Sequence, residues 1–217
     1  MFRKATLLSV LASLALLAPM AHAAKGDVKI TLGGGAGIPM GDFSKKVADG
    51  GAGGSLGFTS GLAVDYMVTS AVAIGVDGNY TSNNLNSDER DLVRTGPPAD
   101  PTFDVKYTQI GGGAHVKYWF PMTGSKLAPY VVGGAGVTSI KGKITSNDPT
   151  LAGETSKSKF GGHGGLGVSY QASEMVGVGV EATYHFISTD KADFGTSSIQ
   201  WVGVSAAVTI GMAKGGK

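Results

Sequence analysis

Hydrophobic and polar residues alternate with a period of two along most of the chain after residue 24. The clearest stretch is 176–186, where Val, Ala, Tyr and Phe at even positions alternate with Gly, Glu, Thr and His at odd positions. Such alternation places successive side chains on opposite faces of a β-strand. It predicts eight strands, around residues 28–33, 61–66, 72–80, 110–120, 128–142, 165–170, 176–186 and 201–212. No convincing amphipathic helix is expected after residue 24.

Two places in this pattern are ambiguous. Residues 128–142 read as a strand of uncertain phase, because Val131 and Val132 compete for the apolar face. Around Thr108 and Gln109 the phase slips by one residue, which predicts a β-bulge.

The connections between the expected strands alternate in length. The breaks at 67–71, 121–128 and 171–175 are short, whereas those at 39–53, 81–103, 143–158 and 187–197 are longer and polar. Outer-membrane β-barrels show this asymmetry, with tight periplasmic turns and longer outside loops. An even number of strands would place both termini of the chain on the periplasmic side.

Large aromatic residues lie near the ends of the expected strands rather than in the middle. This arrangement predicts two girdles at the lipid–water interfaces, flanking an aliphatic band that faces the acyl chains. The expected periplasmic girdle comprises Tyr66, Tyr118, Phe120, Tyr130 and Tyr170. The expected outer girdle comprises Phe58, Tyr80, Phe103, Phe160, Tyr184 and Phe186. The fold class expected is therefore all-β, an antiparallel up-and-down transmembrane β-barrel.

The opposite face of the same strands carries small residues and several charges. Burying unpaired charges in the core of a soluble sandwich would be too costly, but in a narrow barrel they can pair with each other. The expected interior polar network comprises Lys29, Asp65, Asp77, His115, Lys117, His163, Glu181 and His185. Counting from strand ends, Asp77 should face His115 or Lys117, and Lys29 should lie near Asp65. His163 and His185 should be neighbours near the outer mouth.

The N-terminus has the three parts of a secretory signal peptide. Arg3 and Lys4 precede an apolar run at 7–17, and Ala21-His22-Ala23 gives a small-x-small cleavage pattern. Residues 1–23 are expected to be the signal peptide, and residues 24–217 one barrel domain. The whole chain has 18 Lys and Arg against 16 Asp and Glu. The signal holds two of the basic residues, so the remainder is balanced at 16 against 16, and no basic patch suggests a nucleic-acid partner.

Glycine is the compositional outlier, at 36 of 217 residues, and cysteine is absent. Glycine runs such as 33–37 and 133–136 open no helix and precede no Gly-Lys-Ser/Thr, so close packing inside a small barrel explains them better than a phosphate-binding loop. Without cysteine there is neither a disulfide framework nor a thiolate metal site.

The chain resembles the bacterial outer-membrane β-barrel domain family, the small OmpA/OmpX-type barrels, over nearly all of residues 27–212. The resemblance lies in the glycine-rich first strand at 33–37, the exit Pro39-Met40-Gly41-Asp42-Phe43 and strand–turn units such as Tyr66-Met67-Val68-Thr69-Ser70. It implies outer-membrane lipids as surroundings and the barrel assembly machinery as a partner during insertion. One departure is that such barrels commonly end on an aromatic residue, whereas the last expected strand here ends on Met212.

No catalytic, metal or cofactor site is expected. A metal or catalytic cluster of the three interior histidines is a weaker alternative to a polar plug. A hydrolase triad of His163, Ser169 and Glu181 is disfavoured because Ser169 should lie near the periplasmic end and His163 well above it. Eight strands leave an interior filled by side chains, so a general porin is not expected. The expected role is structural or surface-interacting, through the outer loops. Small apolar-ligand binding or transport at the barrel mouth and a lipid-modifying enzyme are the alternatives.

Overall fold

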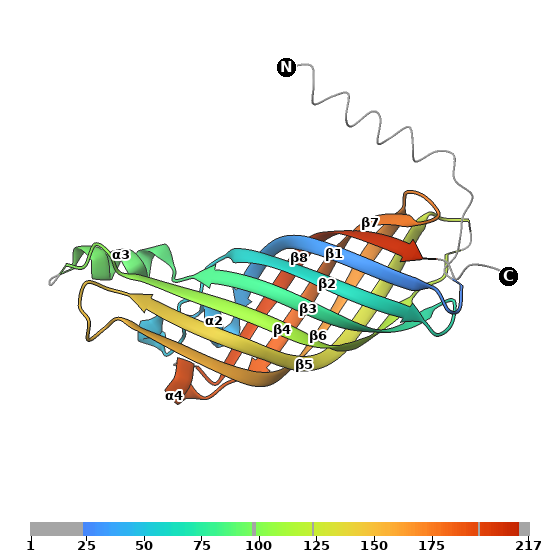
Figure 1. The fold of residues 1–217 in the computed structure, drawn as a ribbon. Helices are drawn as coiled ribbons and strands as arrows, with labels where there is room; N and C mark the ends of the chain where they lie inside the picture. Colours follow the sequence, from blue (N-terminus) through green and yellow to red (C-terminus); the bar gives the residue numbers. More distant parts are fainter. Residues whose placement is uncertain (1–23, 97–98, 123, 195, 213–217) are drawn as a thin grey trace, which may run out of the picture.

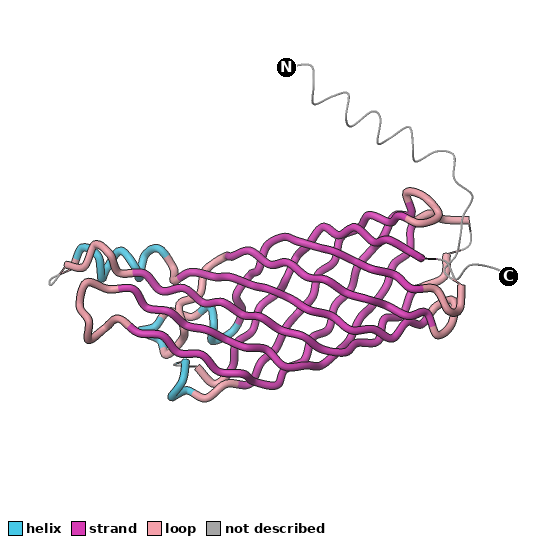
Figure 2. Tube along the Cα trace, in the orientation of Figure 1, coloured by secondary structure: helices cyan, strands magenta, loops and turns pink. Residues whose placement is uncertain are grey.

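The computed structural model describes residues 24–96, 99–122, 124–194 and 196–212. Eight antiparallel strands close into one barrel in which each strand pairs with its neighbours in the chain and β8 pairs with β1 (Figures 1 and 2). The strands are β1 (Val28–Met40), β2 (Gly57–Met67), β3 (Val72–Asn84), β4 (Asp104–Trp119), β5 (Leu127–Thr145), β6 (Gly153–Gln171), β7 (Val176–Ser188) and β8 (Ser198–Met212). The predicted fold class is confirmed. The proposed signal peptide and the tail after Met212 lie outside the described residues.

The connections divide the barrel into a short-turn end and a long-loop end. The β2–β3, β4–β5 and β6–β7 turns lie at the first, where β1 starts and β8 finishes (Figure 1). The long-loop end carries all the helical segments of the described ranges: α2 (Gly41–Ser44), the 3-10 turn η1 (Val47–Asp49), α3 (Ser87–Thr95) and α4 (Lys191–Phe194). None of these helices is long and apolar enough to cross a membrane.

Helix α3 corrects the expectation that no helix follows residue 24. The side chain of Asn86 accepts a hydrogen bond from the Asp88 backbone N–H and caps the helix. Asp88 and Glu89 occupy the first turn and Arg94 the last, as the helix dipole favours. These local signals were present in the sequence, but a nine-residue helix is too short to stand out by periodicity.

Strands β5 and β6 are longer than expected, at 19 residues each. Their pairing runs out to Ile144 and Gly153, so the loop expected at 143–158 shrinks to residues 146–152. The polar residues that suggested a loop belong instead to a hairpin that projects beyond the barrel wall, as far as α3 (Figure 1). Neither face of that projection belongs to the apolar band, so its strands need no apolar face.

The bulge expected near Thr108 and Gln109 is absent. Register is continuous there on both sides of β4, with Thr108 opposite Ser82 and Lys141. The apparent slip has another cause. Val105 is buried, and Tyr107 turns inward to donate a hydrogen bond to the Ala52 carbonyl. Apolar residues therefore fill the inner face at this end.

The aliphatic band faces outward as expected. Val76, Val178 and Val204 in the middle of three strands are exposed on the barrel surface. The aromatic residues Tyr66, Tyr118 and Phe120 at one end, and Phe58, Tyr80, Phe160, Tyr184 and Phe186 at the other, are exposed too. Tyr170 is partly exposed on the outward face, where it pairs with Val178.

Two of the expected girdle residues lie elsewhere. Tyr130 points into the barrel and is only 5% exposed, because β5 takes the phase in which Val131 is outside and Val132 lines the interior. Strand β4 starts at Asp104, well beyond the outer girdle, and Phe103 comes just before that start. Phe103 therefore lies in the loop, beyond the ring to which it was assigned.

Replacing a lipid-facing residue by a charge provides a test of this outward face. Val76 lies mid-strand and is 60% exposed, so Val76→Arg should lower the free energy of unfolding in lipid vesicles by about 2–4 kcal/mol. Leu92→Arg on α3, which is also exposed but belongs to a loop, is the control and should change it by less than about 0.5 kcal/mol. Equal effects of the two substitutions would contradict a lipid-facing Val76.

Candidate functional site

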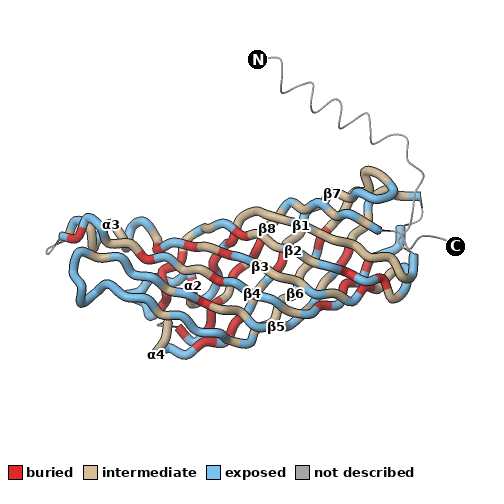
Figure 3. The backbone as a smooth tube through the Cα atoms, in the orientation of Figure 1, coloured by how far each residue is buried: buried red, intermediate tan, exposed pale blue. Residues whose placement is uncertain are grey.

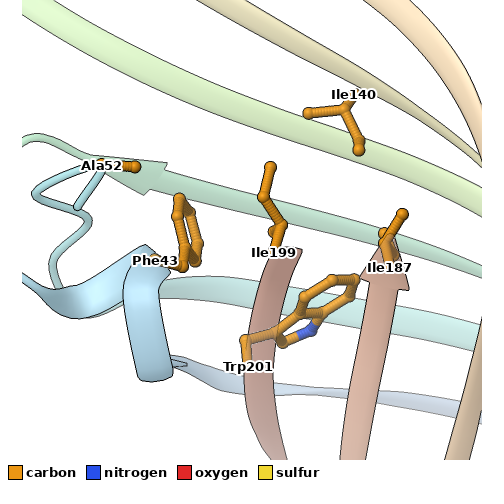
Figure 4. Close-up of a cluster of buried hydrophobic side chains, with 6 residues drawn as sticks. All are labelled: Phe43, Ala52, Ile140, Ile187, Ile199 and Trp201. Carbon is orange, nitrogen blue, oxygen red and sulfur yellow. The ribbon is translucent and has the colours of Figure 1, made fainter. Parts of the chain in front are cut away.

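The long-loop end of the barrel is closed from inside by a cluster of apolar side chains. Its members are Phe43, Ala52, Ile140, Ile187, Ile199 and Trp201, all buried (Figure 4). Gly41, with a φ of +55°, turns the chain after β1 so that Phe43 of α2 points back into the mouth. There Phe43 packs edge-on against Tyr107, with 5.3 Å between ring centres. The mouth is therefore filled by the protein's own chain.

A second apolar cluster lies inside the short-turn end. Met67, Ala73, Trp119 and Tyr130 are buried together, with 4.5 Å between the two ring centres. The Lys29 ammonium lies 4.3 Å from the centre of the Trp119 ring, in a cation–π arrangement. The lumen thus has two apolar layers, and the Asp65–His115–Lys117 group is held between them.

His115 is at the centre of the charged layer. Its Nε2 lies 2.6 Å from an oxygen of Asp65, and its Nδ1 lies 2.9 Å from an oxygen of Asp77. The other oxygen of Asp65 accepts a hydrogen bond of 2.8 Å from the Lys117 ammonium. Both imidazole nitrogens can donate at once only in the imidazolium form, and in that form two cations balance two carboxylates. Asp65 is 0% exposed, so this pairing is what makes its burial tolerable.

The network continues toward the long-loop cluster through two further histidines. His163 Nε2 lies 3.7 Å from the Asp77 oxygen that His115 contacts. The His163 and His185 rings are 5.6 Å apart, and His185 stacks on Trp201 with 4.5 Å between centres. Glu181 belongs to another branch: its two oxygens accept hydrogen bonds from the Tyr130 and Thr183 hydroxyls.

Register explains why these residues meet. Going once around the barrel from Lys29, successive partners are Asp65, Gly75, His115, Gly134, His163, His185, Trp201 and Pro39. Pro39 is ten residues beyond Lys29 on β1, and this offset is the shear of the barrel. Five of the eight expected network residues therefore stand on a single register line.

The glycines on this line make room for the rings. A Cβ on Gly75 would lie 2.7 Å from His115 Nε2, and one on Gly134 would lie 2.5 Å from His163 Cε1. Gly167 has the same relation to Tyr130: a Cβ added to Gly167 would lie 2.4 Å from a carbon of the Tyr130 ring. The interior rings lie over glycines of a neighbouring strand, so the lumen is filled without widening the barrel.

All eight expected network residues face the interior, but not every expected pairing forms. Asp77 meets His115 as expected, and His163 and His185 are neighbours. Lys117 binds Asp65 rather than Asp77. Lys29 lies near Asp65 as expected, since the two are register partners, and its ammonium is placed over the Trp119 ring. The roles of Trp119 and Tyr130 were missed. For Tyr130 the sequence did hold a signal: if Val131 rather than Val132 faces outward, Tyr130 must face the interior.

The two chemical sites considered from the sequence, a metal cluster and a hydrolase triad, do not assemble in the described part of the chain. No group of three or more His, Asp or Glu residues there could hold a metal ion. Glu181 has one oxygen bonded to Tyr130 and the other to Thr183, and His163 contacts Asp77 and His185. His163, Ser169 and Glu181 therefore do not form a triad.

A cavity of about 110 Å³ remains between the layers, beside Asp77, His163 and Glu181, with room for several water molecules. A vestibule of about 640 Å³ lies at the short-turn end, beside Lys29 and Trp119.

The segments at the long-loop end are bonded to one another. Glu89 of α3 accepts a hydrogen bond from the Val47 N–H in the first loop. Asp100 accepts hydrogen bonds from the Ser146 hydroxyl and the Asn147 N–H, which joins the second loop to the third. The Thr102 hydroxyl also donates a hydrogen bond to Asp100. Together the hydrogen bonds from the Ser146 and Thr102 hydroxyls are the main reason why the pKa of Asp100 is lowered to about 2. Lys159 of β6 pairs with Asp190 beside α4.

Comparison with known proteins agrees with this architecture. Residues 8–206 match the family model described as outer membrane protein beta-barrel domain. A search of curated proteins gave no match. Neisserial surface protein A is 18% identical with a TM-score of 0.56, over 85% of this chain and 98% of that chain. A major outer membrane protein from Thermus thermophilus is 12% identical with a TM-score of 0.55, over 85% and 99% of the two chains.

A third similar structure is the attachment invasion locus protein of Yersinia pestis in complex with the heparin analogue sucrose octasulfate. It is 13% identical with a TM-score of 0.51, over 87% of this chain and 99% of that chain. At these identities the likeness concerns the fold.

A double-mutant cycle tests the charged layer. Asp65→Asn and Lys117→Met should be coupled by more than about 1 kcal/mol in unfolding free energy, because each removes one partner of a buried, hydrogen-bonded pair. Asp77→Asn with Lys117→Met is the matched cycle and should give a clearly smaller coupling, because Lys117 reaches Asp77 only through Asp65 and His115. Urea unfolding in lipid vesicles provides the measurement. Stronger coupling in the second cycle would mean that Lys117 binds Asp77.

Two adjacent glycines test the packing of the rings. Gly134→Ala should destabilise the barrel by about 1–3 kcal/mol, because the new methyl group would collide with His163 and with the Ala114 carbonyl. Gly133→Ala is the control, since a Cβ there meets nothing within 4 Å, and it should be neutral or slightly stabilising. Equal unfolding midpoints for the two variants would contradict the ring-over-glycine arrangement.

Proposed function

The chain belongs to the outer membrane protein beta-barrel domain family, and on that premise we propose that it is a non-enzymatic surface-interaction protein with a closed lumen. The family indicates the bacterial outer membrane as its location. In that setting the short turns face the periplasm and the long-loop end faces outside. The observation that carries the proposal is the contrast between a blocked interior and a cross-linked outer end.

The blocked interior disfavours general diffusion. Phe43 and Trp201 fill the lumen at the outer end, Trp119 and Tyr130 at the other, and the Asp65–His115–Lys117 group lies between them. A hydrated solute would have to displace apolar side chains at two levels and break a buried charge network between them. Phe43 also occupies the place that a small apolar ligand at the outer mouth would need.

The outer end favours recognition. Glu89 and Asp100 tie the first three outer connections to one another, and Lys159 of β6 ties the fourth to the barrel wall, so that the four form one cap. A cap held in one conformation can bind a partner without the entropic cost of ordering long loops. A fixed shape is not needed for a merely solvated loop, so this bonding supports a binding role.

Deletion of the α3 segment, combined with a permeability assay, tests the proposal. Bacteria displaying the wild-type barrel should adhere to immobilised heparin or to extracellular-matrix protein, and replacement of Ser87–Thr95 by a Gly-Ser linker should reduce adhesion at least about tenfold. Heparin is a first probe because a protein of the same fold was crystallised with a heparin analogue. Glu174→Gln, in the turn at the opposite end, is the control. Liposomes containing the wild-type barrel should not swell in sugar solutions.

Three results would count against the proposal. These are adhesion that is absent in the wild type, adhesion unchanged by the loop replacement, and porin-like swelling. Heat-modifiable gel migration of each variant verifies that the barrel is folded, so that loss of adhesion is attributable to the loop.

A further inference from the structure

The outward face of strands β4, β5 and β6 changes composition in a regular way toward the outer end. The rung Val137–Phe160 is apolar, and the next is Ile110–Ser139–Ser158. It is followed by Thr108–Lys141–Ser156 and then by Lys106–Lys143–Glu154. Since partners in register lie on the same face, this surface passes from apolar through hydroxyl-bearing to cationic side chains.

The three lysines lie on the side of the strands that faces lipid lower down. Ile140, between Ser139 and Lys141, is buried inside, which fixes Lys141 and Lys143 on the outside. Lys106 is the register partner of Lys143 and shares its face. All three are exposed, and Figure 3 shows the projecting end of the β5–β6 hairpin largely in the exposed colour. They continue the lipid-facing surface beyond its apolar band.

The positive charge on this patch is only partly neutralised. Lys106 and Lys143 stand directly opposite each other, an arrangement that destabilises a strand pair. No ion pair or side-chain hydrogen bond joins either to another residue within the described ranges. The two acids on the same face are already engaged: Glu154 lies 2.7 Å from Lys141, and Asp104 lies 4.0 Å from Arg90. Arg90 also lies 3.6 Å from Asp91, so the four cationic side chains of this region face three carboxylates.

The height of the patch matches the headgroup layer. From Ile110, an exposed apolar residue on this face of β4, to Lys106 the strand rises about 13 Å, which a tilt of about 40° reduces to about 10 Å along the barrel axis. Headgroups extend roughly 5–7 Å beyond the hydrocarbon on each side, and a lysine stem can lie along apolar surface while its ammonium reaches the polar layer. A lipid packed on Phe160 and Ile110 would carry its headgroup to the level of Lys141, and the Lys106 and Lys143 stems can reach down to it from the next rung.

From this placement we infer that Lys106, Lys141 and Lys143 form a binding site for the phosphate groups of an outer-leaflet lipid. An ammonium binds phosphate as a compact point charge, and one phosphate between Lys106 and Lys143 converts their repulsion into two attractions. The neighbouring hydroxyls of Thr108 and Ser156 can donate to the same group. A soluble polyanion is the less suitable occupant, because the patch is on the membrane side of the hairpin rather than on its tip.

Lipid retention by the purified full-length protein tests the inference. Wild type and the double variant Lys106→Gln/Lys143→Gln are inserted into vesicles of phosphatidylcholine doped with fluorescent lipopolysaccharide, then extracted, and the retained lipopolysaccharide is measured. The double variant should retain it on the order of tenfold more weakly. The control variant Lys46→Gln/Lys191→Gln removes the same amount of charge from other outer loops, and it should retain as much lipopolysaccharide as wild type. A dephosphorylated glycolipid should be retained weakly by all three.

The alternative outcomes overturn the assignment. Equal retention by wild type and the patch variant, or equal retention of phosphorylated and dephosphorylated lipid, would exclude a phosphate site here. Binding of soluble sucrose octasulfate by wild type and by the patch variant is measured as well. If the patch variant lost binding of that polyanion while keeping the lipid, the lysines would serve a soluble ligand instead. Heat-modifiable migration verifies folding of every variant, and the adhesion test of the outer cap is independent of these results.

Discussion

A strand wall that crosses lipid has no water with which its backbone can share hydrogen bonds, so the wall must close on itself. Closure is the constraint on which the rest of this structure depends. It directs one side of every strand to acyl chains and the other to a narrow lumen. Two consequences of this requirement are the outward position of Val76 and the inward position of Asp65 and His115. A charge can be kept inside because the wall excludes lipid and partners are within reach on other strands.

The narrow lumen then determines which side chains can share it. Rings at His115, His163 and Tyr130 lie over glycines of the adjacent strands, and a methyl group at Gly134 or Gly167 would collide with them. The abundance of glycine is in part a packing requirement of a small barrel whose interior carries large polar groups. The same crowding leaves only about 110 Å³ of cavity beside Asp77. A protein built in this way can be stable, but it offers little passage for solutes.

What distinguishes this barrel is therefore outside the lumen. The β5–β6 hairpin continues past the apolar band, and its two faces differ. The inward face carries Lys159, bound to Asp190 of the outer cap, whereas the outward face carries Lys143, opposite Lys106 of β4, both without partners in the described ranges. One face of the extension thus organises the loops, and the other adds cationic groups at the height of lipid headgroups. Surface interaction and lipid contact are served by opposite sides of the same extension.

The sequence by itself determined the fold class, because period-two alternation, alternating connection lengths and aromatic residues at strand ends are local patterns that any closed barrel in lipid must show. It also determined which charged residues face inward, since parity along a strand decides the face. It did not determine the phase of β5, where adjacent valines left Tyr130 ambiguous, nor the length of the β5–β6 hairpin. It also did not determine that Lys117 binds Asp65 and not Asp77. Those outcomes depend on shear, the offset of ten residues on going once around the barrel, which brings together residues on neighbouring strands and is a property of the closed sheet alone.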